Sequence, residues 1–183
     1  MHDDAPVNVP IDPMLKASLI DACCHVLGNT FRISRITLTY QWNTMGQGAF
    51  QAEGCFKEQA DELHTALTPI AEHIRGLGGV AILDYSDQTL SAAPSFFSEL
   101  PSLSDMFQSL IEHHREACLT IEAAIDIAQE SADWPSIGLL SDRLATHRRH
   151  AWRNSIGMSA TGETMLISNN VETRRVNRPR SSR

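Results

Sequence analysis

Side chains able to bind a metal ion or to form ion pairs recur between residues 53 and 72. On a helix of 3.6 residues per turn, Glu53, Lys57, His64, Thr68 and Glu72 fall within about 100° of one another and form one lateral strip. Carboxylate and imidazole groups bind divalent transition metals, whereas a lysine ammonium repels a cation and pairs with carboxylates. The strip therefore predicts either a metal site or a salt-bridged contact.

The length of this strip indicates a site shared between two subunits. Glu53 and Glu72 are 19 residues apart, which is about 28 Å along a helix. One subunit cannot bring both carboxylates to one ion. Two antiparallel copies crossing near Leu63 would place Glu53 of one beside Glu72 of the other, and a twofold contact does this twice. We therefore expect any site on the strip to lie at a homodimer interface.

The other histidines with informative spacing support different interpretations. His114 lies on an apolar stripe, which is typical of a hydrogen-bonded core residue. His147 and His150 are three residues apart and share one side of a helix, but the sequence leaves their role open. Asp61 and His64 have the same spacing, which resembles an in-bundle iron motif. Neighbouring leucines occupy the inward stripe there, so we expect this pair to face outward.

Four helical patterns must position these residues. Apolar side chains recur at three- and four-residue steps in each pattern, and aromatic and β-branched runs are few, which favours helices over sheets. The patterns cover about 13–44, 48–77, 102–128 and 135–161.

Capping residues mark most of the expected helix ends. Asp12-Pro13 is typical of a helix start, Ser102 and Asp105 form a capping-box pattern, and Gly78-Gly79 is typical of a helix stop. We expect Gly162 to end the last helix.

The connections between these helices define the fold class. They are short, long and short, and the long one, residues 80–101, contains turn-forming residues and a short helical pattern at 95–100. A long connection allows the two helices that it joins to run parallel. The prediction is an all-α, ferritin-like four-helix bundle with one long crossover carrying a short helix. Residues 1–12 are expected to be an extended arm, 13–161 the bundle, and 162–183 a flexible tail.

The charge of the tail differs from that of the rest of the chain. The chain carries a net charge of −7, whereas the residues after 171 contain five arginines and one glutamate. Repeated around an oligomer, such a basic tail would bind phosphates non-specifically, through many weak and salt-dependent contacts. The alternatives are a solubilising terminus or a contact with an acidic patch of the same assembly. The candidate DNA-binding residues are Arg174, Arg175, Arg178, Arg180 and Arg183.

Cysteine usage and hydropathy indicate a cytoplasmic protein. The four cysteines, Cys23, Cys24, Cys55 and Cys118, show no zinc-binding spacing. They are expected to be free thiols in a reducing compartment. No apolar run approaches membrane-spanning length, and the first residues lack the basic and apolar regions of a secretion signal. We therefore expect no membrane association.

Short motifs along the chain occur in a characteristic order. They are Trp42-Asn43, Gly46, Phe56, Gln59, Ala71-Glu72, Leu77-Gly78-Gly79, Glu112-His113-His114, and His147 followed by His150-Ala151-Trp152. In this order and spacing, residues 13–160 resemble a subunit of the Dps family of mini-ferritins. The resemblance implies a hollow shell of twelve subunits, built from twofold dimers, that oxidises ferrous iron with peroxide and stores ferric mineral. In many members of the family the shell also binds DNA.

The resemblance also implies where iron would bind. The family's ligand positions, which lie between two subunits, correspond to Gln41, Glu53, Lys57, Thr68 and Glu72. Only Glu72 keeps the family's residue type. Glu53, Glu72 and Gln41 would offer a weak ligand set, with His64 as an added ligand near the twofold axis. Alternatively, Lys57 replaces the charge of the metal and makes the site a salt-bridged dimer contact. In a third alternative the strip is simply solvated.

These observations lead to one main functional expectation and three competing ones. The main expectation is a Dps-like cytoplasmic, nucleoid-associated shell that protects DNA and handles iron under oxidative or starvation stress, with an atypical oxidation site. The alternatives are an active ferroxidase with rearranged ligands, a DNA-packing shell without chemistry, and an unrelated four-helix interaction module.

Overall fold

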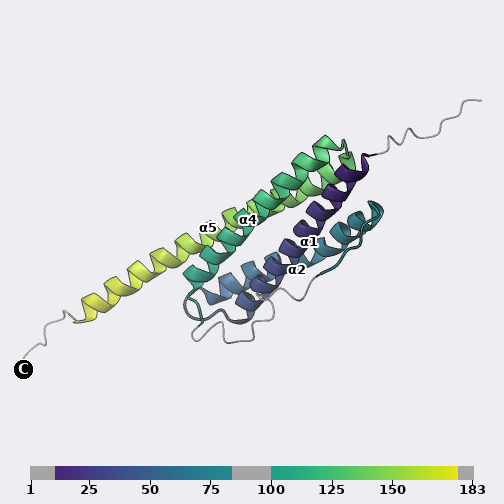
Figure 1. The fold of residues 1–183 in the computed structure, drawn as a ribbon. Coiled ribbons are helices and arrows are strands. Elements are labelled where there is room, and N and C mark those ends of the chain that lie inside the picture. Colours follow the sequence, from purple (N-terminus) through teal and green to yellow (C-terminus); the bar gives the residue numbers. More distant parts are fainter. Residues whose placement is uncertain (1–10, 84–99, 177–183) are drawn as a thin grey trace, which may run out of the picture.

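The computed structural model describes residues 11–83 and 100–176, with side chains up to residue 161. Within these ranges the chain forms helices and no strands (Figure 1). The helices are α1 (Pro13–Trp42), α2 (Ala49–Gly76), α4 (Leu103–Glu130) and α5 (Trp134–Val176). The prediction of an all-α four-helix fold is therefore confirmed. The short helix expected in the crossover falls mostly within residues 84–99, which lie outside the described residues.

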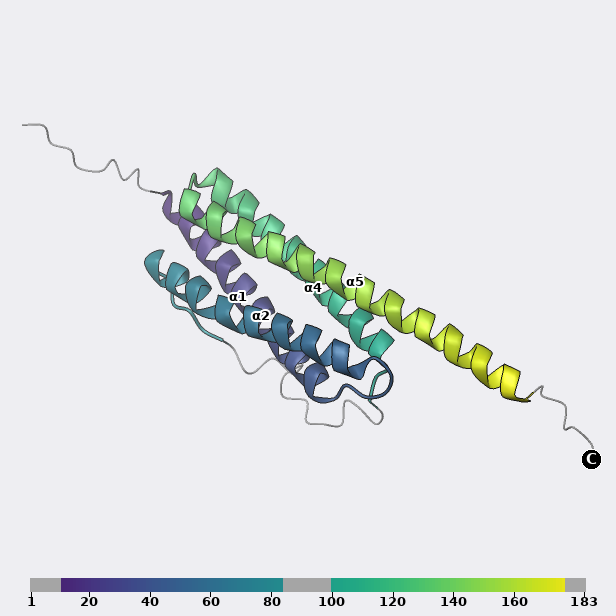
Figure 2. The same cartoon turned by 180° about the vertical axis from the view of Figure 1, so that it is seen from behind.

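The helices form two hairpins that pack side by side. The α1–α2 hairpin and the α4–α5 hairpin meet mainly through α1 and α4, and both views of the ribbon show α2 and α4 running in the same direction (Figures 1 and 2). This parallel pair is the arrangement that the long crossover predicts. Of the four neighbouring pairs around the bundle, α2 and α5 approach each other least closely.

The predicted caps define the helix ends. The Asp12 carboxylate accepts a hydrogen bond from the backbone N–H of Met14 at 2.8 Å. In the capping box before α4, the Ser102 hydroxyl accepts from the Asp105 N–H at 3.1 Å, and the Asp105 carboxylate accepts from the Ser102 N–H at 3.3 Å. Gly78 has a φ of +88°, which glycine adopts without strain, and it follows the last residues of α2 as predicted.

The apolar core consists of two clusters. One contains Leu19, Leu27, Ile70, Ile74, Ile121 and Leu140. The other surrounds Phe56, whose ring centroid lies 4.9 Å from that of Phe107 and 6.3 Å from that of Tyr40. Gly157 of α5 packs directly on the Phe107 ring, since an added Cβ would lie 2.5 Å from it. These contacts tie α1, α2, α4 and α5 into one bundle.

The last helix is longer than predicted. We expected Gly162 to end it, but α5 continues to Val176. A single glycine costs a helix only about 1 kcal/mol, and the sequence has no proline between Pro135 and Pro179 to stop it. The apolar stripe ends near residue 161 because α5 there passes the beginning of α4, so the end of the stripe marks the end of the bundle and not the end of the helix.

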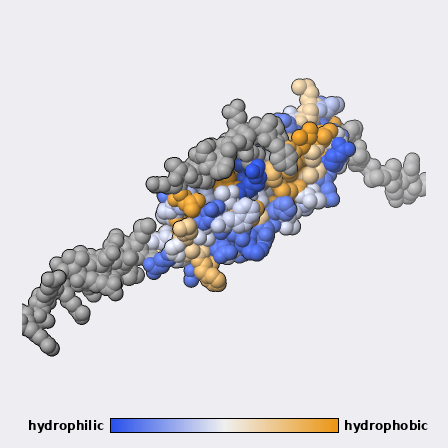
Figure 3. Space-filling model, turned by 90° about the horizontal axis from the view of Figure 1, so that it is seen from below, coloured by the Kyte–Doolittle hydropathy of each residue, from blue (hydrophilic) through white to orange (hydrophobic). Residues whose placement is uncertain are grey.

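The surface of the bundle is mixed in character. Figure 3 shows hydrophilic residues over the middle of the visible face and hydrophobic residues gathered near its two ends. Among the described residues, no helix is both long enough and apolar enough to cross a membrane.

Candidate functional site

The strip predicted from the sequence lies on the outer face of α2. Phe56, Leu63, Ile70 and Ile74 turn the opposite face of this helix into the core. As a result, Glu53, Lys57, His64, Thr68 and Glu72 are all exposed. Asp61 is exposed as well, so the Asp61 and His64 pair faces outward as expected.

The charged groups of the strip have few partners within the subunit. Lys57 forms an ion pair with Asp61, one turn further along α2. Among the described residues, the side chains of Glu53, His64 and Glu72 form no hydrogen bond or ion pair. One helix keeps Glu53 and Glu72 about 28 Å apart, and Gln41 lies half-buried at the end of α1. A single subunit therefore does not bring the four predicted metal ligands together, and the metal site stays a prediction about two subunits.

A second group of polar residues lies inside the bundle. Gln59 of α2 and Asn154 of α5 are fully buried and pair through both amide groups: Gln59 Nε2 donates to Asn154 Oδ1 at 2.8 Å, and Asn154 Nδ2 donates to Gln59 Oε1 at 3.0 Å. His114 of α4 lies next to them, with its Nε2 3.3 Å from Gln59 Oε1. His114 is thus a hydrogen-bonded core residue, as predicted.

Two further histidines of α5 complete this interior layer. His114 Nδ1 and His147 Nδ1 are 2.9 Å apart. The ring centroid of His150 lies 5.2 Å from that of His114, and its Nε2 lies 3.0 Å from Glu62 Oε2 without the alignment of a hydrogen bond. All three imidazoles are completely buried. Among the described residues, no three His, Cys, Asp or Glu side chains are arranged to hold a metal ion.

Ion pairs between α2 and α5 cover the interior layer on its outer side. Arg149 donates to Glu62 at 2.5 Å, and Arg153 binds both carboxylate oxygens of Glu58, at 2.5 and 2.7 Å. The hydrogen bond from Arg153 lowers the pKa of Glu58. Burial raises the pKa of Glu62, but its hydrogen bond with Arg149 and the nearby cations outweigh burial, and the net direction is downward. Both glutamates are thus held in their charged forms.

The interior histidines are held in their neutral forms. Burial, followed by the neighbouring His147, lowers the pKa of His114 to about 2. Burial, followed by the neighbouring His150, lowers the pKa of His147 to about 4. Burial lowers the pKa of His150 to about 4 as well, although the nearby Glu62 acts in the opposite direction. At neutral pH the layer therefore carries no imidazolium charge.

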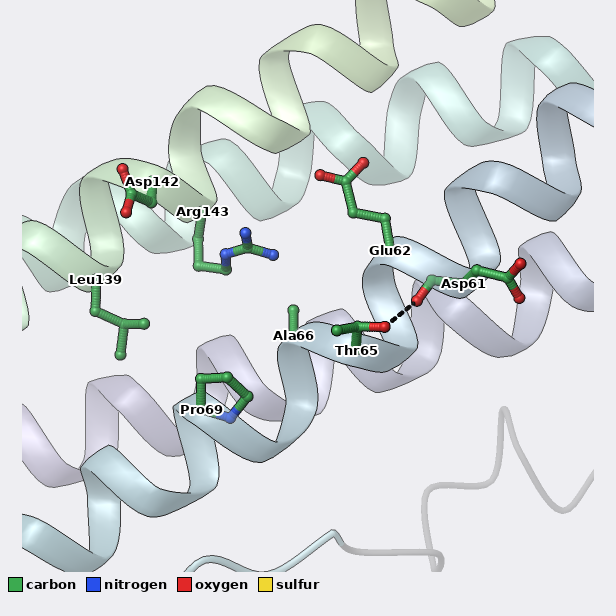
Figure 4. Close-up of a pocket in the computed structure, with 8 residues that line it drawn as sticks. All are labelled: Asp61, Glu62, Thr65, Ala66, Pro69, Leu139, Asp142 and Arg143. Atoms are coloured by element: carbon green, nitrogen blue, oxygen red, sulfur yellow. Dashed lines mark hydrogen bonds between the residues drawn. The ribbon is translucent and has the colours of Figure 1, made fainter.

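A groove between α2 and α5 lies beside Glu62, the carboxylate that faces His150. Its volume is about 460 Å³, and Glu62, Ala66, Leu139 and Arg143 are among its lining residues. Figure 4 shows Glu62 and Arg143 extending from opposite walls. One guanidinium nitrogen of Arg143 is buried and has no hydrogen-bond partner among the described residues. The groove follows the seam where the two helices approach each other least.

The predicted DNA-binding arginines differ in their surroundings. Residues 174 and 175 belong to the last turn of α5, beyond the end of the bundle. Arg178, Arg180 and Arg183 lie outside the described residues.

A comparison with protein-family models assigns the fold. Residues 20–155 match the model of the ferritin-like domain. The chain belongs to the ferritin-like domain family. Among curated sequences, this ferritin-like chain is 20% identical over 148 residues to an uncharacterised low-temperature-induced protein of Nostoc sp. (strain PCC 7120), a match that covers 80% of the chain and 83% of the relative.

Solved structures with the same fold include Dps proteins. The Dps protein of Vibrio cholerae O1, described as a member of a superfamily of ferritin-like diiron-carboxylate proteins, matches with a TM-score of 0.71 at 20% identity, over 85% of this chain and 98% of that one. A dodecameric thioferritin of Bacteroides fragilis matches with a TM-score of 0.72 at 18% identity, over 82% and 90% of the two chains. The ferritin-like chain thus has the fold of a Dps subunit, as the sequence motifs predicted.

Proposed function

We propose that this ferritin-like protein is a Dps-like, shell-forming protein of the cytoplasm and nucleoid that handles iron and protects DNA under stress. Membership of the ferritin-like family supports the iron-handling part. The descriptions of similar structures as diiron-carboxylate and dodecameric proteins support iron as the cargo and a twelve-subunit shell as the assembly. The enzymatic status of the protein depends on the chemistry of the α2 strip.

The observation that carries this proposal is the exposed outer face of α2. Its charged strip has apolar residues beyond both ends: Trp42 and Phe50 are 69% and 84% exposed at one end, and Val80 and Ile82 are 62% and 66% exposed at the other. In an antiparallel pair of α2 helices, the apolar group at the start of each helix would lie against the apolar group at the end of the other. A twofold contact would therefore bury both groups in each copy. The same packing would bring Glu53 of each copy toward Glu72 of the other.

Lys57 decides the chemistry of this contact. It lies between Glu53 and His64 on the strip, and among the described residues its ammonium pairs only with the exposed Asp61. Since an ammonium among the ligands repels a second cation, we infer that Lys57 takes the place of a metal at the interface and that Glu53 and Glu72 act as ion-pair partners. The second candidate is a retained iron site formed by Glu53, Glu72, Gln41 and His64, which would make the protein a ferroxidase.

Peroxide-driven oxidation of ferrous iron separates the two candidates. We expect metal-free wild-type protein to oxidise iron at the background rate, and Glu72→Ala to leave that rate unchanged. Lys57→Ala should weaken the dimer by about 1 kcal/mol, or roughly fivefold in its dissociation constant, which is typical of an exposed ion pair. The measurements are the absorbance of ferric iron and the mass of the protein in solution.

Glu130→Ala, which removes an exposed glutamate at the end of α4, is the matched control. Fast oxidation that is lost in Glu72→Ala but kept in Glu130→Ala would favour the ferroxidase. A monomeric mass at all concentrations would contradict the shell itself.

The basic end of the chain supports the DNA-binding part of the proposal. We expect full-length protein to shift DNA in a gel, and a variant ending at Val171 to bind at least tenfold more weakly, because it lacks all five arginines and their phosphate contacts. The apparent affinity of the full-length protein should also fall steeply with salt.

A variant with the five arginines changed to glutamine keeps the length of the chain and is the control for truncation. It should bind as weakly as the truncated protein. Equal DNA affinity of the wild type and both variants would show that these arginines do not contribute to DNA binding.

A further inference from the structure

The hydrogen bonds of the interior layer fix the protonation of two imidazoles. Gln59 Oε1 can only accept, so the His114 Nε2 beside it carries the hydrogen. His114 Nδ1 is then an acceptor, and the hydrogen of its 2.9 Å contact must come from His147 Nδ1. This leaves His147 Nε2 with a bare lone pair, which is completely buried and has no partner among the described residues. That atom can take up a proton without breaking any bond of the layer.

His150 offers a second buried place for a proton. Its Nδ1 has no partner among the described residues, and its Nε2 faces Glu62. A proton on His150 Nε2 would point at Glu62 Oε2, while Arg149 holds the other carboxylate oxygen, Oε1. Burial opposes a proton on either imidazole more strongly than Glu62 favours it, and a proton on His147 Nε2 has no acceptor among the described residues, so the layer tolerates protons poorly while the bundle is closed.

The charges around the layer compensate for such protons only in part. The groups acting on the three imidazoles are Glu58 and Glu62 from α2, His113 from α4, and Arg143, Arg149 and Arg153 from α5; the described part of α1 supplies none. Three arginines thus face two glutamates, and both glutamates are already paired. Any added positive charge meets a surplus of cations.

The repulsion between the added protons and the nearby cations can be relieved at the seam between α2 and α5. These two helices approach each other least among the neighbouring pairs. The groove already hollows the seam (Figure 4), and ion pairs whose glutamates are partly exposed hold it. Opening it would admit water to His147 and His150, whereas α1 and α4 hold the rest of the bundle through apolar contacts.

We propose that the interior histidine layer is a proton-operated latch: proton uptake by His147 and His150 opens the α2–α5 seam. The inference rests on the interior of the subunit alone and is independent of iron or DNA. Acid opens the latch because the exposed imidazoles of the open state bind protons at the ordinary pKa near 6.5, whereas burial in the closed state lowers both values to about 4. Between roughly pH 6.5 and 4 the opening constant then rises up to about tenfold per histidine for each pH unit.

Hydrogen exchange of the full chain, read by mass spectrometry, tests the latch. Labelling times are scaled for the pH dependence of chemical exchange, and peptides from each helix are compared between pH 7 and pH 5. We expect at least a tenfold loss of protection in 56–66 of α2 and 143–154 of α5, with little change in 19–33 of α1. Unchanged protection, or an equal loss in all helices, would overturn the proposal.

Two variants tie the opening to the interior histidines. His147→Gln with His150→Gln should remove most of the loss of protection between pH 7 and pH 5. His25→Gln, which removes an exposed histidine of α1, should leave it unchanged. If the double variant loses protection on acidification as wild type does, the latch is wrong. If the double variant does not fold, the comparison between helices in the wild-type protein still tests the proposal.

Discussion

Replacing Gln59 by leucine is expected to lower the free energy of unfolding by about 3–5 kcal/mol. The side chain is completely buried, and its amide forms both hydrogen bonds of the pair with Asn154 and accepts from His114. Leucine is similar in size but offers no polar atom. The Asn154 amide and the His114 Nε2–H would then be buried without partners, and each such group costs about 1–3 kcal/mol.

Chemical denaturation at pH 7 measures this cost, and a second substitution shows its origin. Adding Asn154→Val to Gln59→Leu removes one of the orphaned partners, so the double variant should recover part of the loss. Gln51→Leu, at an exposed position of the same helix, should change stability by less than about 0.5 kcal/mol. A Gln59→Leu variant as stable as Gln51→Leu would contradict the hydrogen-bonded layer.

Replacing Phe56 by alanine is expected to cost about 3–5 kcal/mol. Phe56 is completely buried, and its ring lies between those of Tyr40 and Phe107. Removing it takes away apolar contacts and leaves a cavity at the end of the bundle where α1, α2 and α4 meet. The rings around it come from two helices and cannot close the space without moving the backbone.

Phe50 provides a matched comparison, because it lies in the first turn of the same helix but is 84% exposed. Phe50→Ala should leave the unfolding midpoint of dilute, unassembled protein nearly unchanged, whereas Phe56→Ala should lower it strongly. Comparable losses in the two variants would mean that the core is not centred on Phe56. A loss of assembly in Phe50→Ala without a loss of subunit stability would support the proposed dimer contact.

Most of the fold follows from local patterns. The apolar stripes and the capping groups at Asp12 and Ser102 act within one or two helical turns, so the sequence alone places these helix ends. The end of α5 could not be predicted in this way. An apolar stripe marks where a helix packs against neighbouring helices, and beyond residue 161 α5 has no neighbouring helix among the described residues.

The site was predictable in part, for a similar reason. One helix fixes the spacing of Glu53, His64 and Glu72, so their place on one exposed strip follows from the sequence. The interior layer joins Gln59 to His114 and Asn154, which are 55 and 95 residues away. Such pairing depends on how far three helices slide along one another. Gln59 and Asn154 gave only a weak signal, as polar residues at positions within apolar stripes.

The length of α5 has a mechanical meaning. With 43 residues against 28 in α4, it projects about 22 Å past its neighbour. A stiff rod holds its end at a fixed height, whereas a flexible linker spreads it over a volume. Residues 174 and 175 are therefore displayed at a set distance from the bundle. In a closed assembly, such rods would hold the basic groups at a fixed spacing. This spacing sets the effective concentration of basic groups that a long polyanion encounters.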